Sequence, residues 1–453
     1  MTLSQVRTVI GAGTGTAAGL TGKGVGVALI DTGVAPVAGL PAAKVVNGPD
    51  LSFESQAPNL RYLDTFGHGT HMAGIIVGND AATGTKGLAP DVKLTSIKVG
   101  TANGAVDVSQ VMAAVDWVVE HRNDDPANPI KVINLSYGSG GTPNTWDDPL
   151  GFAVEKAWQA GILVVAAAGN DGNDFGALAN PASDEFILTV GAAATKGTTA
   201  LTDDTLATFT NLPKAGKQIN VLAPGVSIMS LRDGGSYIDT TYPTARVGET
   251  LFRGSGTSQA TAVTSAAAAL LLQARPTATP DQLKDWLIKS SARVPNGVAA
   301  NLGLQEINVN AAIALTTTTQ KPTWNPSNGS GTLDNSRGSS RVVFDTMPLA
   351  GQRTVWGPVT TATWAARSGA GDSWSGGSWM GFRLAGDGWT GTSWASRTWA
   401  ASTWSNSAPW TGAGTTWSDP AWAGRSWTGR SWTAGSWTGR SWASDDWSSA
   451  YWG

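Results

Sequence analysis

The amino-acid sequence predicts an α/β protein with a three-layer, doubly wound and mostly parallel sheet, followed by a Trp-rich, low-complexity C-terminal region. Five nearly continuous apolar segments have the composition of strands that are buried on both faces. Segments with helical periodicity alternate with these strands, as they do in a sheet whose parallel strands are connected by helices. Near residue 316 the composition changes to Ser, Thr, Gly and Trp, which marks the end of this domain.

The elements follow from local patterns. Residues 107–122 (DVSQVMAAVDWVVEHR) repeat apolar side chains at helical spacing, which predicts a helix. Residues 279–290 begin with a Thr cap and a Pro at the first helical position, which also predicts a helix. The expected strands are 25–32 (VGVALIDT), 92–99 (VKLTSIKV), 131–136 (KVINLS), 161–170 (GILVVAAAGN) and 186–193 (FILTVGAA).

Composition excludes several classes of protein. The 453 residues carry a formal net charge of -3 and no run of Lys or Arg, so we expect no nucleic-acid partner. There is no cysteine, which excludes disulfides, thiolate metal sites and a thiol nucleophile. The longest apolar runs, such as 266–272, are too short to span a bilayer, and residues 1–13 lack the apolar stretch of a signal peptide. We therefore expect no membrane span and no signal peptide in this chain.

Polar residues end three of the expected strands: Asp31, Ser136 and Asn170. In open α/β sheets ligands bind outside the carboxyl ends of the strands, so these positions are candidates for a site. Asp31 also precedes Thr-Gly, where a turn role is an alternative.

Two histidines lie close together in the segment DTFGHGTHMAGII. His68 and His71 have the spacing of an HxxH metal pair, but no further His or Cys ligand set accompanies them, so no metal site is predicted. His121 closes the helix expected at 107–122, where a cation suits the helix dipole, and a structural role is expected.

Asp31, His68 and Ser258 together supply the side chains that nucleophilic acyl chemistry requires. A serine hydroxyl needs a base to take its proton, and the base needs an acidic partner that holds its tautomer. Ser258 lies in FRGSGTSQATAV, where two glycines precede a predicted buried helix whose positive N-terminus suits developing negative charge. Asn170 supplies an amide donor for an oxyanion. The order Asp, His, Ser differs from that of the chymotrypsin and α/β-hydrolase triads.

The blocks GVGVALIDTGV, FGHGTHMAGI, VINLSYGSG, VVAAAGNDG and GSGTSQA resemble, in order and spacing, those of subtilisin-like serine peptidases of family S8. The resemblance covers about residues 20–315. It implies Asp31, His68 and Ser258 as the catalytic triad, with the Asn170 amide and the Ser258 backbone N–H as the oxyanion hole. It further implies that the peptide substrate adds as a strand to the edge formed by Ser136, Tyr137 and Gly138. Ala167 and Gly169 would line the pocket for the residue before the scissile bond.

The chain departs from the family pattern at several positions. Gln259 and Ala262 stand where Met and Pro are usual, and neither position performs chemistry. Family members often bind structural calcium after the His helix; Asn79 and Asp80 offer oxygens there, but Ala81 replaces an expected Asn, so calcium is only weakly supported. No other cofactor is expected. Secreted members of the family are made with a signal peptide and a prodomain, whereas this sequence starts almost at the mature domain. A mispredicted start codon, a chain given in trimmed form and an intracellular enzyme are the alternatives. The resemblance implies an extracellular or cell-surface location.

We expect three regions: a subtilisin-like peptidase domain over 1–315, a linker over 316–372 rich in Thr, Pro, Gly and Ser, and a Trp pentad-repeat tail over 373–453. From Trp422 to Trp452 a Trp recurs every five residues. This period fits either a four-sided β-solenoid or a flexible chain whose Trp side chains act as separate adhesive groups. The second reading predicts attachment to cell-wall glycan or another surface polymer, and a tail without a ligand is the alternative.

The function expected from these residues is that of a serine endopeptidase acting on polypeptides through an acyl-enzyme. Two alternatives remain open on the same fold. One is a non-catalytic surface-binding protein, against which the complete set of Asp, His, Ser and Asn argues. The other is an acyltransferase, in which an amine intercepts the acyl-enzyme in place of water.

Overall fold

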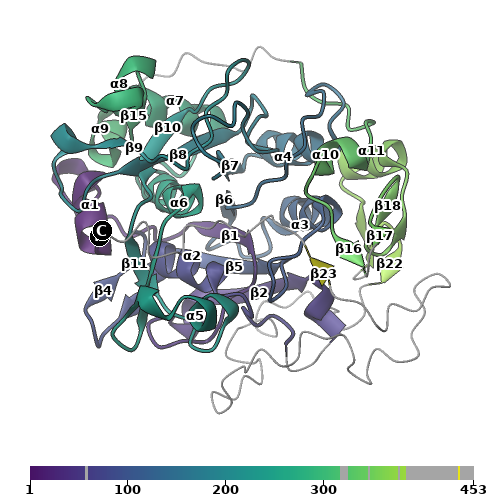
Figure 1. The fold of residues 1–453 in the computed structure, drawn as a ribbon, viewed down its shortest axis with the longest axis horizontal. Helices are drawn as coiled ribbons and strands as arrows, with labels where there is room; N and C mark the ends of the chain where they lie inside the picture. The colour runs from purple at the N-terminus through teal and green to yellow at the C-terminus, as the bar shows by residue number, and fades with distance from the viewer. Residues whose placement is uncertain (57–59, 317–324, 345–346, 376–377, 384–436, 439–453) are drawn as a thin grey trace.

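The computed structural model describes residues 1–56, 60–316, 325–344, 347–375, 378–383 and 437–438. A ten-stranded sheet runs through the middle of the molecule (Figure 1). Its central strands follow the order β10-β8-β7-β6-β1-β5-β2 and pair in parallel. Their bounds are Val221–Pro224 for β10, Leu188–Ala194 for β8, Leu163–Ala167 for β7, Ile130–Leu135 for β6, Gly26–Asp31 for β1, Lys93–Lys98 for β5 and Val45–Asp50 for β2.

The order of these strands places a topological switch at β1. After β1 the chain moves to β2 and β5 on one side, and then crosses to β6 and β7 on the other. In sheets of this kind ligands bind at such a switch, so a site is expected at the carboxyl ends of β5, β1 and β6. Every residue of β1 is buried, as its continuous apolar sequence predicts.

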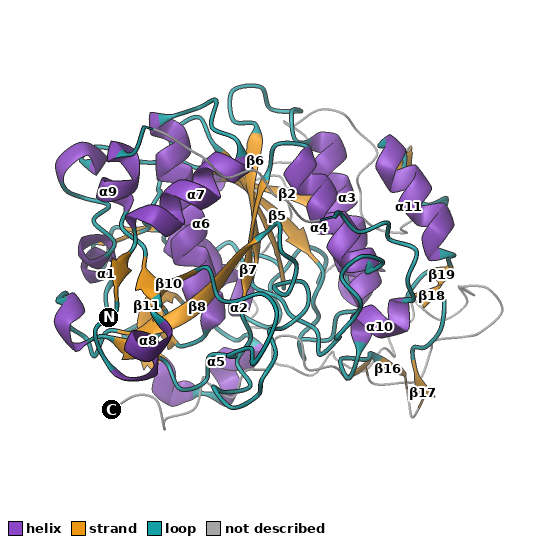
Figure 2. Cartoon of the chain, turned by 90° about the horizontal axis from the view of Figure 1, so that it is seen from above, coloured by secondary structure: helices purple, strands orange, loops and turns teal. Residues whose placement is uncertain are grey.

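Helices cover both faces of the sheet. Figure 2 shows α2 (His68–Val77) and α6 (Thr257–Ala274) on one face and α3 (Val108–His121) and α4 (Pro149–Gln159) on the other. Helix α6 is buried from Thr257 to Leu272, because it packs on β6, β7, β8 and β10 and also on α2. Its many small alanine side chains allow the helix backbone to lie close to the strands and to α2. This arrangement confirms the predicted three-layer fold.

The predicted elements correspond to β1, β5, β6, β7 and β8, and to α3 and α7 (Pro280–Ser290). Thr279 caps α7 in a capping box, with Pro280 at its first position. The sequence analysis missed β2, whose residues VVNGPD are not continuously apolar. Among the described strands, β2 is an edge strand that pairs only with β5, so the Pro near its end can leave its missing N–H on the unpaired side of the strand.

Smaller elements complete the part of the chain before residue 316. A three-stranded antiparallel sheet of β11 (Ile228–Leu231), β13 (Leu251–Gly254) and β12 (Arg246–Val247) leads directly into α6. The remaining elements are α1 Leu3–Val9, β3 Asn79–Asp80, β4 Thr85–Lys86, β9 Thr205–Leu206, α5 Tyr237–Thr241, β14 Ala292–Arg293, α8 Gly297–Leu302, β15 Gln305–Glu306 and α9 Val309–Ala314. No helix of the described ranges is both long and apolar enough to cross a membrane.

Residues 325–383, as far as they are described, fold onto α3 and α4 (Figure 1). The indole N–H groups of Trp364 and Trp379 both donate to Asp116 of α3 at 2.8 Å, and both rings are fully buried. This region covers most of the predicted linker and the start of the predicted tail. Its elements are α10 Leu333–Arg337, β16 Val343–Phe344, β17 Met347–Pro348, β18 Arg353–Thr354, β19 Gly357–Pro358, α11 Thr361–Ala370, β20 Trp374–Ser375, β21 Ser378–Trp379 and β22 Phe382–Arg383.

Of the Trp pentad repeat, only β23 (Trp437–Thr438) is described, and it pairs with β16. The solenoid and the flexible arrangement predicted for the repeat concern residues that lie outside the described ranges.

Candidate active site

Asp31 and His68 meet at the carboxyl end of β1. Nδ1 of His68 lies 2.8 Å from Oδ1 of Asp31, which also accepts the backbone N–H of Thr32 at 2.7 Å. Both side chains are buried. Burial raises the pKa of Asp31, and the charge and hydrogen bond of His68 oppose that rise. With Nδ1–H donating to the carboxylate, Nε2 is left as the basic nitrogen of the ring.

The backbone at the start of α2 holds His68 in this position. Gly67 has a left-handed φ of 101° and precedes His68, and its N–H donates to Asp64 at 2.7 Å. A Cβ on Gly69 would lie 2.0 Å from the carbonyl oxygen of Gly33, so only glycine lets the helix approach the turn after β1. The Gly69 N–H donates to Thr32 Oγ1 at 2.9 Å. The GHGT sequence is therefore required by the close contact between the two elements.

Ser258 lies in the first turn of α6 and is 8% exposed. Its hydroxyl donates to the backbone carbonyl of Ser136 at 3.4 Å, and the Ser136 hydroxyl donates to the Ser258 carbonyl at 3.1 Å. The candidate nucleophile thus lies beside the edge at which the resemblance expects the substrate. Its position at the N-terminus of an 18-residue helix favours negative charge on the groups bound there.

The carboxamide of Asn170 is oriented by the same helix. Its Oδ1 accepts both the backbone N–H and the hydroxyl of Thr257, each at 2.8 Å. Since the oxygen is held by these two donors, the NH₂ group is the end that remains for an oxyanion. A Cβ on Gly256 would lie 3.4 Å from Asn170 Nδ2, so glycine keeps the space beside that amide open.

Residues 136–138 follow β6 directly. The Tyr137 side chain is buried, at 1% exposure, so only its backbone is suited to pair with a substrate strand. Ser139 pairs with Asn180 in an antiparallel bridge, which ends this edge. A Cβ on Gly138 would lie 2.5 Å from Cβ of Ala179, so the backbone lies too close to its neighbour for any side chain at this position.

Ala167 ends β7 and is buried, and Gly169 follows it with a φ of 112°. The Gly169 N–H donates to Thr257 Oγ1 at 3.3 Å, which ties this turn to the start of α6. The carboxyl ends of β1, β6 and β7 therefore lie at one edge of the sheet, and contacts of His68, Ser258 and Thr257 tie the first turns of α2 and α6 to this edge.

His71 and Asp80 are placed where they do not suit a metal. His71 is fully buried, and its Nε2 lies 3.2 Å from the carbonyl oxygen of Phe252. Burial lowers its pKa to about 3, with a smaller contribution from His68. The Asp80 carboxylate accepts the hydroxyls of Thr83 at 2.6 Å and Thr250 at 2.7 Å, so protein donors already occupy the oxygens that calcium would need. Within the described ranges no group of three His, Cys, Asp or Glu side chains is arranged for a metal ion.

His121 lies at the end of α3, as the sequence analysis expects of a structural histidine. Its Nδ1 lies 2.8 Å from the carbonyl oxygen of Trp117, and the two rings stack with centroids 4.5 Å apart.

A buried ion pair beside Asp31 was not predicted from the sequence. Lys98 ends β5 opposite Asp31, is 1% exposed, and lies 3.0 Å from Glu54 Oε2. Its Nζ donates to the carbonyl of Thr32 at 2.8 Å. A Lys at the end of the predicted buried strand VKLTSIKV was the available signal, since Lys is almost never fully buried unless it is paired.

A model of the subtilase family matches residues 22–331. The chain belongs to the subtilase family. Serine protease AprX of Bacillus subtilis (strain 168) is 38% identical over 275 residues, which are 59% of this chain and 61% of AprX. Subtilisin DY of Bacillus licheniformis is 34% identical over 301 residues, 65% of this chain and 93% of that protein.

Among solved structures, this subtilase is similar to fervidolysin from Fervidobacterium pennivorans, a keratinolytic enzyme related to subtilisin. The TM-score is 0.54 at 25% identity, and the match covers 70% of this chain and 46% of fervidolysin. These matches confirm the predicted fold and the predicted family. The chain spans about 61% of the length of AprX and 46% of that of fervidolysin. The family model ends before the Trp pentad repeat.

Proposed function

We propose that this subtilase hydrolyses peptide bonds through an acyl-enzyme on Ser258. The observation that carries the proposal is the 2.8 Å contact between Asp31 and His68 at the end of β1, next to the end of β6, where Ser258 in the first turn of α6 contacts Ser136. His68 Nε2 takes the Ser258 proton as Oγ attacks the substrate carbonyl, and then gives that proton to the leaving amine. A water molecule repeats the sequence and releases the acid.

Asp31 orients His68 and stabilises the imidazolium that forms during each proton transfer. The Asn170 amide and the Ser258 backbone N–H stabilise the oxyanion of the tetrahedral intermediate, and the dipole of α6 adds to this effect. Substrate residues before the scissile bond pair as a strand with Ser136, Tyr137 and Gly138, and Ala167 and Gly169 line the pocket beyond. Each of these groups belongs to the protein chain, so the reaction needs no cofactor.

The first test is labelling of the purified chain with a fluorophosphonate probe, together with hydrolysis of casein. We expect labelling and proteolysis that both disappear in Ser258→Ala and persist in Ser290→Ala, a serine on α7. Labelling that survives in Ser258→Ala, or a folded protein that neither labels nor cleaves casein, would contradict the proposal and favour the surface-binding alternative.

Product analysis separates hydrolysis from acyl transfer. In the presence of an added amine, a hydrolase yields mainly the free acid, whereas an acyltransferase yields mainly the amide. A predominance of amide at low amine concentration would assign the same residues to the alternative reaction.

We further propose an extracellular or cell-surface location, with the tail over 373–453 attaching the enzyme to a surface polymer. The support is compositional, since exposed Trp rings bind sugars and interfaces. Retention of the full chain on purified cell wall, compared with a chain whose Trp residues from Trp422 to Trp452 are replaced by Ala, tests this role; equal retention would contradict it.

A further inference from the structure

Two loops follow the strands on either side of β1, which ends at Asp31. Since β1 is placed between β5 and β6, the loop after β5 (99–107) borders one side and the loop after β6 (136–148) borders the other. The second loop begins with the edge at 136–138 where we place the substrate. A substrate strand placed at this edge would therefore run between the two loops.

Helix α10 and the residues after it contact the loop after β6. The Ser139 hydroxyl donates to the carbonyl of Ser336, and the Gly140 N–H donates to Ser340 Oγ at 2.8 Å. A Cβ on Gly141 would lie 2.3 Å from the Ser336 carbonyl oxygen, so the two backbones touch along this stretch. The contact starts one residue beyond the predicted substrate edge.

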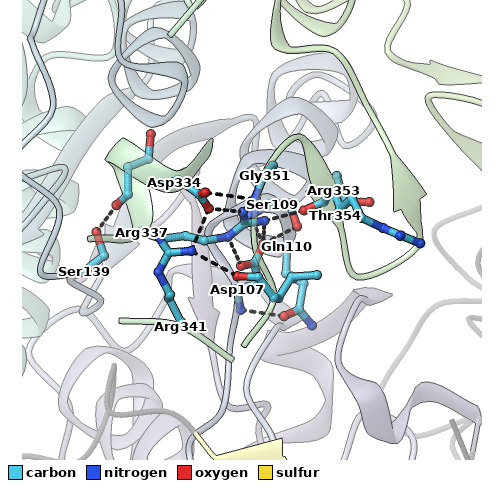
Figure 3. Close-up of polar contacts among 12 residues, drawn as sticks. Asp107, Ser109, Gln110, Ser139, Asp334, Arg337, Arg341, Gly351, Arg353 and Thr354 are labelled. Carbon is cyan, nitrogen blue, oxygen red and sulfur yellow. Dashed lines mark hydrogen bonds and ion pairs between the residues drawn. The ribbon is translucent and has the colours of Figure 1, made fainter. Parts of the chain in front are cut away.

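The same helix contacts the loop after β5 through a buried ion pair. Arg337 is fully buried, and its Nε lies 2.6 Å from Oδ1 of Asp107 while its Nη2 lies 3.2 Å from Oδ2 (Figure 3). Asp107 caps the N-terminus of α3 and so terminates that loop. Val342 packs against Ala105 of the loop and against Phe53.

The remaining donors of Arg337 hold α10 itself in place. Nη1 lies 3.1 Å from Asp334 Oδ1 and donates to the Gly351 carbonyl at 3.0 Å, and Nη2 donates to the Arg353 carbonyl (Figure 3). A guanidinium with so many fixed partners is a rigid connector, because its planar fork satisfies several acceptors in one geometry. Segments more than 200 residues apart are thereby joined at the loop after β5.

We propose that residues 333–342, here called the bridge segment, set the spacing of the two loops and so determine how well extended peptides bind. This inference rests on the proposed function. Residues of the bridge segment position the substrate edge and do not touch the reacting atoms. Changes in the segment should therefore lower kcat/KM for substrates that pair with the edge over several residues. They should leave kcat/KM unchanged for a short substrate that reacts at Ser258 without pairing with the edge.

The test compares two substrates with the same leaving group on the purified full chain. One carries four residues before the scissile bond, and the other carries only the last of these residues with a blocked amine. The variants are Gly141→Ala, which forces the backbones apart, and Arg337→Lys, which keeps the charge but loses the fork. Trp364→Phe is the matched control, because it removes a buried contact of the same C-terminal region at Asp116, away from both loops.

We expect the ratio of kcat/KM for the long substrate to that for the short one to fall about tenfold in Gly141→Ala and Arg337→Lys, the effect of one well-placed backbone hydrogen bond or two. The short-substrate kcat/KM and the labelling rate of Ser258 should stay within about twofold of the unchanged protein. Trp364→Phe should lower the melting temperature and leave the ratio unchanged.

Ser340→Ala provides a mild variant if the others fail to fold, because it removes only the surface acceptor of the Gly140 N–H. We expect Ser340→Ala to lower the ratio of kcat/KM for the long substrate to that for the short one by about threefold, and this result would support the inference. A ratio within about twofold of the unchanged protein in every folded variant, or an equal fall in Trp364→Phe, would overturn it. If the unchanged protein hydrolyses neither substrate in a Ser258-dependent way, the proposed function itself is wrong and the inference falls with it.

Discussion

His68 donates from Nδ1 to Asp31 Oδ1 over 2.8 Å, within a turn where Asp31 also accepts the Thr32 N–H. Asp31→Asn should lower kcat/KM for peptides by about 10⁴-fold, because an amide in place of the carboxylate favours the wrong tautomer of His68 and does not stabilise its cation. Steady-state hydrolysis of a peptide substrate measures the effect. Asp91→Asn, on a partly exposed ion pair with Lys44, is the control and should keep full activity. A loss below about tenfold in Asp31→Asn would contradict the assigned role.

Asn170→Ala should lower kcat by about 10²- to 10³-fold while KM changes little, because the lost donor acts on the oxyanion and not on the bound substrate. Thr257→Val removes one of the two donors that hold Asn170 Oδ1 and should give a smaller loss, of about threefold to tenfold. Saturation kinetics with the same peptide separate the two parameters. If both variants instead raised KM at constant kcat, Asn170 would be a substrate-binding group.

His71 should make the protein less stable in acid. Burial lowers its pKa to about 3 in the folded chain, whereas the pKa in the unfolded chain is about 6.5. Between these values the unfolded state binds more protons, so the free energy of unfolding falls as the pH is lowered from about 6.5 towards 3. His71→Gln keeps a neutral donor to the Phe252 carbonyl and should weaken this dependence, by about 3 kcal/mol at pH 4.5. Urea unfolding at pH 7 and 4.5 measures it; parallel losses in both proteins would contradict the prediction.

Lys98→Met should lower the free energy of unfolding by about 3–5 kcal/mol, because it leaves Glu54 as a buried charge without its cation. The double variant Lys98→Met with Glu54→Gln should regain part of that loss, since the Glu54 side chain is then neutral. Thermal unfolding of the single and double variants tests the pair. A double variant that is less stable than Lys98→Met would show that the two side chains act separately.

Asp116→Ala should destabilise the protein by about 3 kcal/mol, because it leaves the buried indole N–H groups of Trp364 and Trp379 and the Ser368 hydroxyl without their acceptor. Asp372→Ala, an exposed carboxylate of the same region, is the control and should change the stability little. Denaturant unfolding followed by Trp fluorescence compares them. Equal stability of both variants would show that residues 361–379 contribute little to the fold.

Local patterns were sufficient for much of the fold and for the identity of the candidate site. The strands β1, β6, β7 and β8 are mostly apolar because both of their faces are buried, and this property is visible without a structure. β2 was missed because an outer strand tolerates Asn, Gly and Pro. Asp31, His68, Asn170 and Ser258 were identifiable because polar residues stand directly at the ends of apolar strands or before an apolar helix.

The sequence by itself determined the layers of the domain, the family and the residue types available for chemistry, because these depend on neighbours along the chain. Only the tertiary structure decided which distant groups compensate one another. Lys98 pairs with Glu54, and Arg337 pairs with Asp107, which lies 230 residues away in the sequence. These charges are buried, so each of them needs an oppositely charged partner that only the folded chain brings close. Residues 325–383 show no helical or strand period in their sequence, so only the structure shows that they pack on α3 and α4 through indole and guanidinium donors that fit carboxylates of the preceding domain.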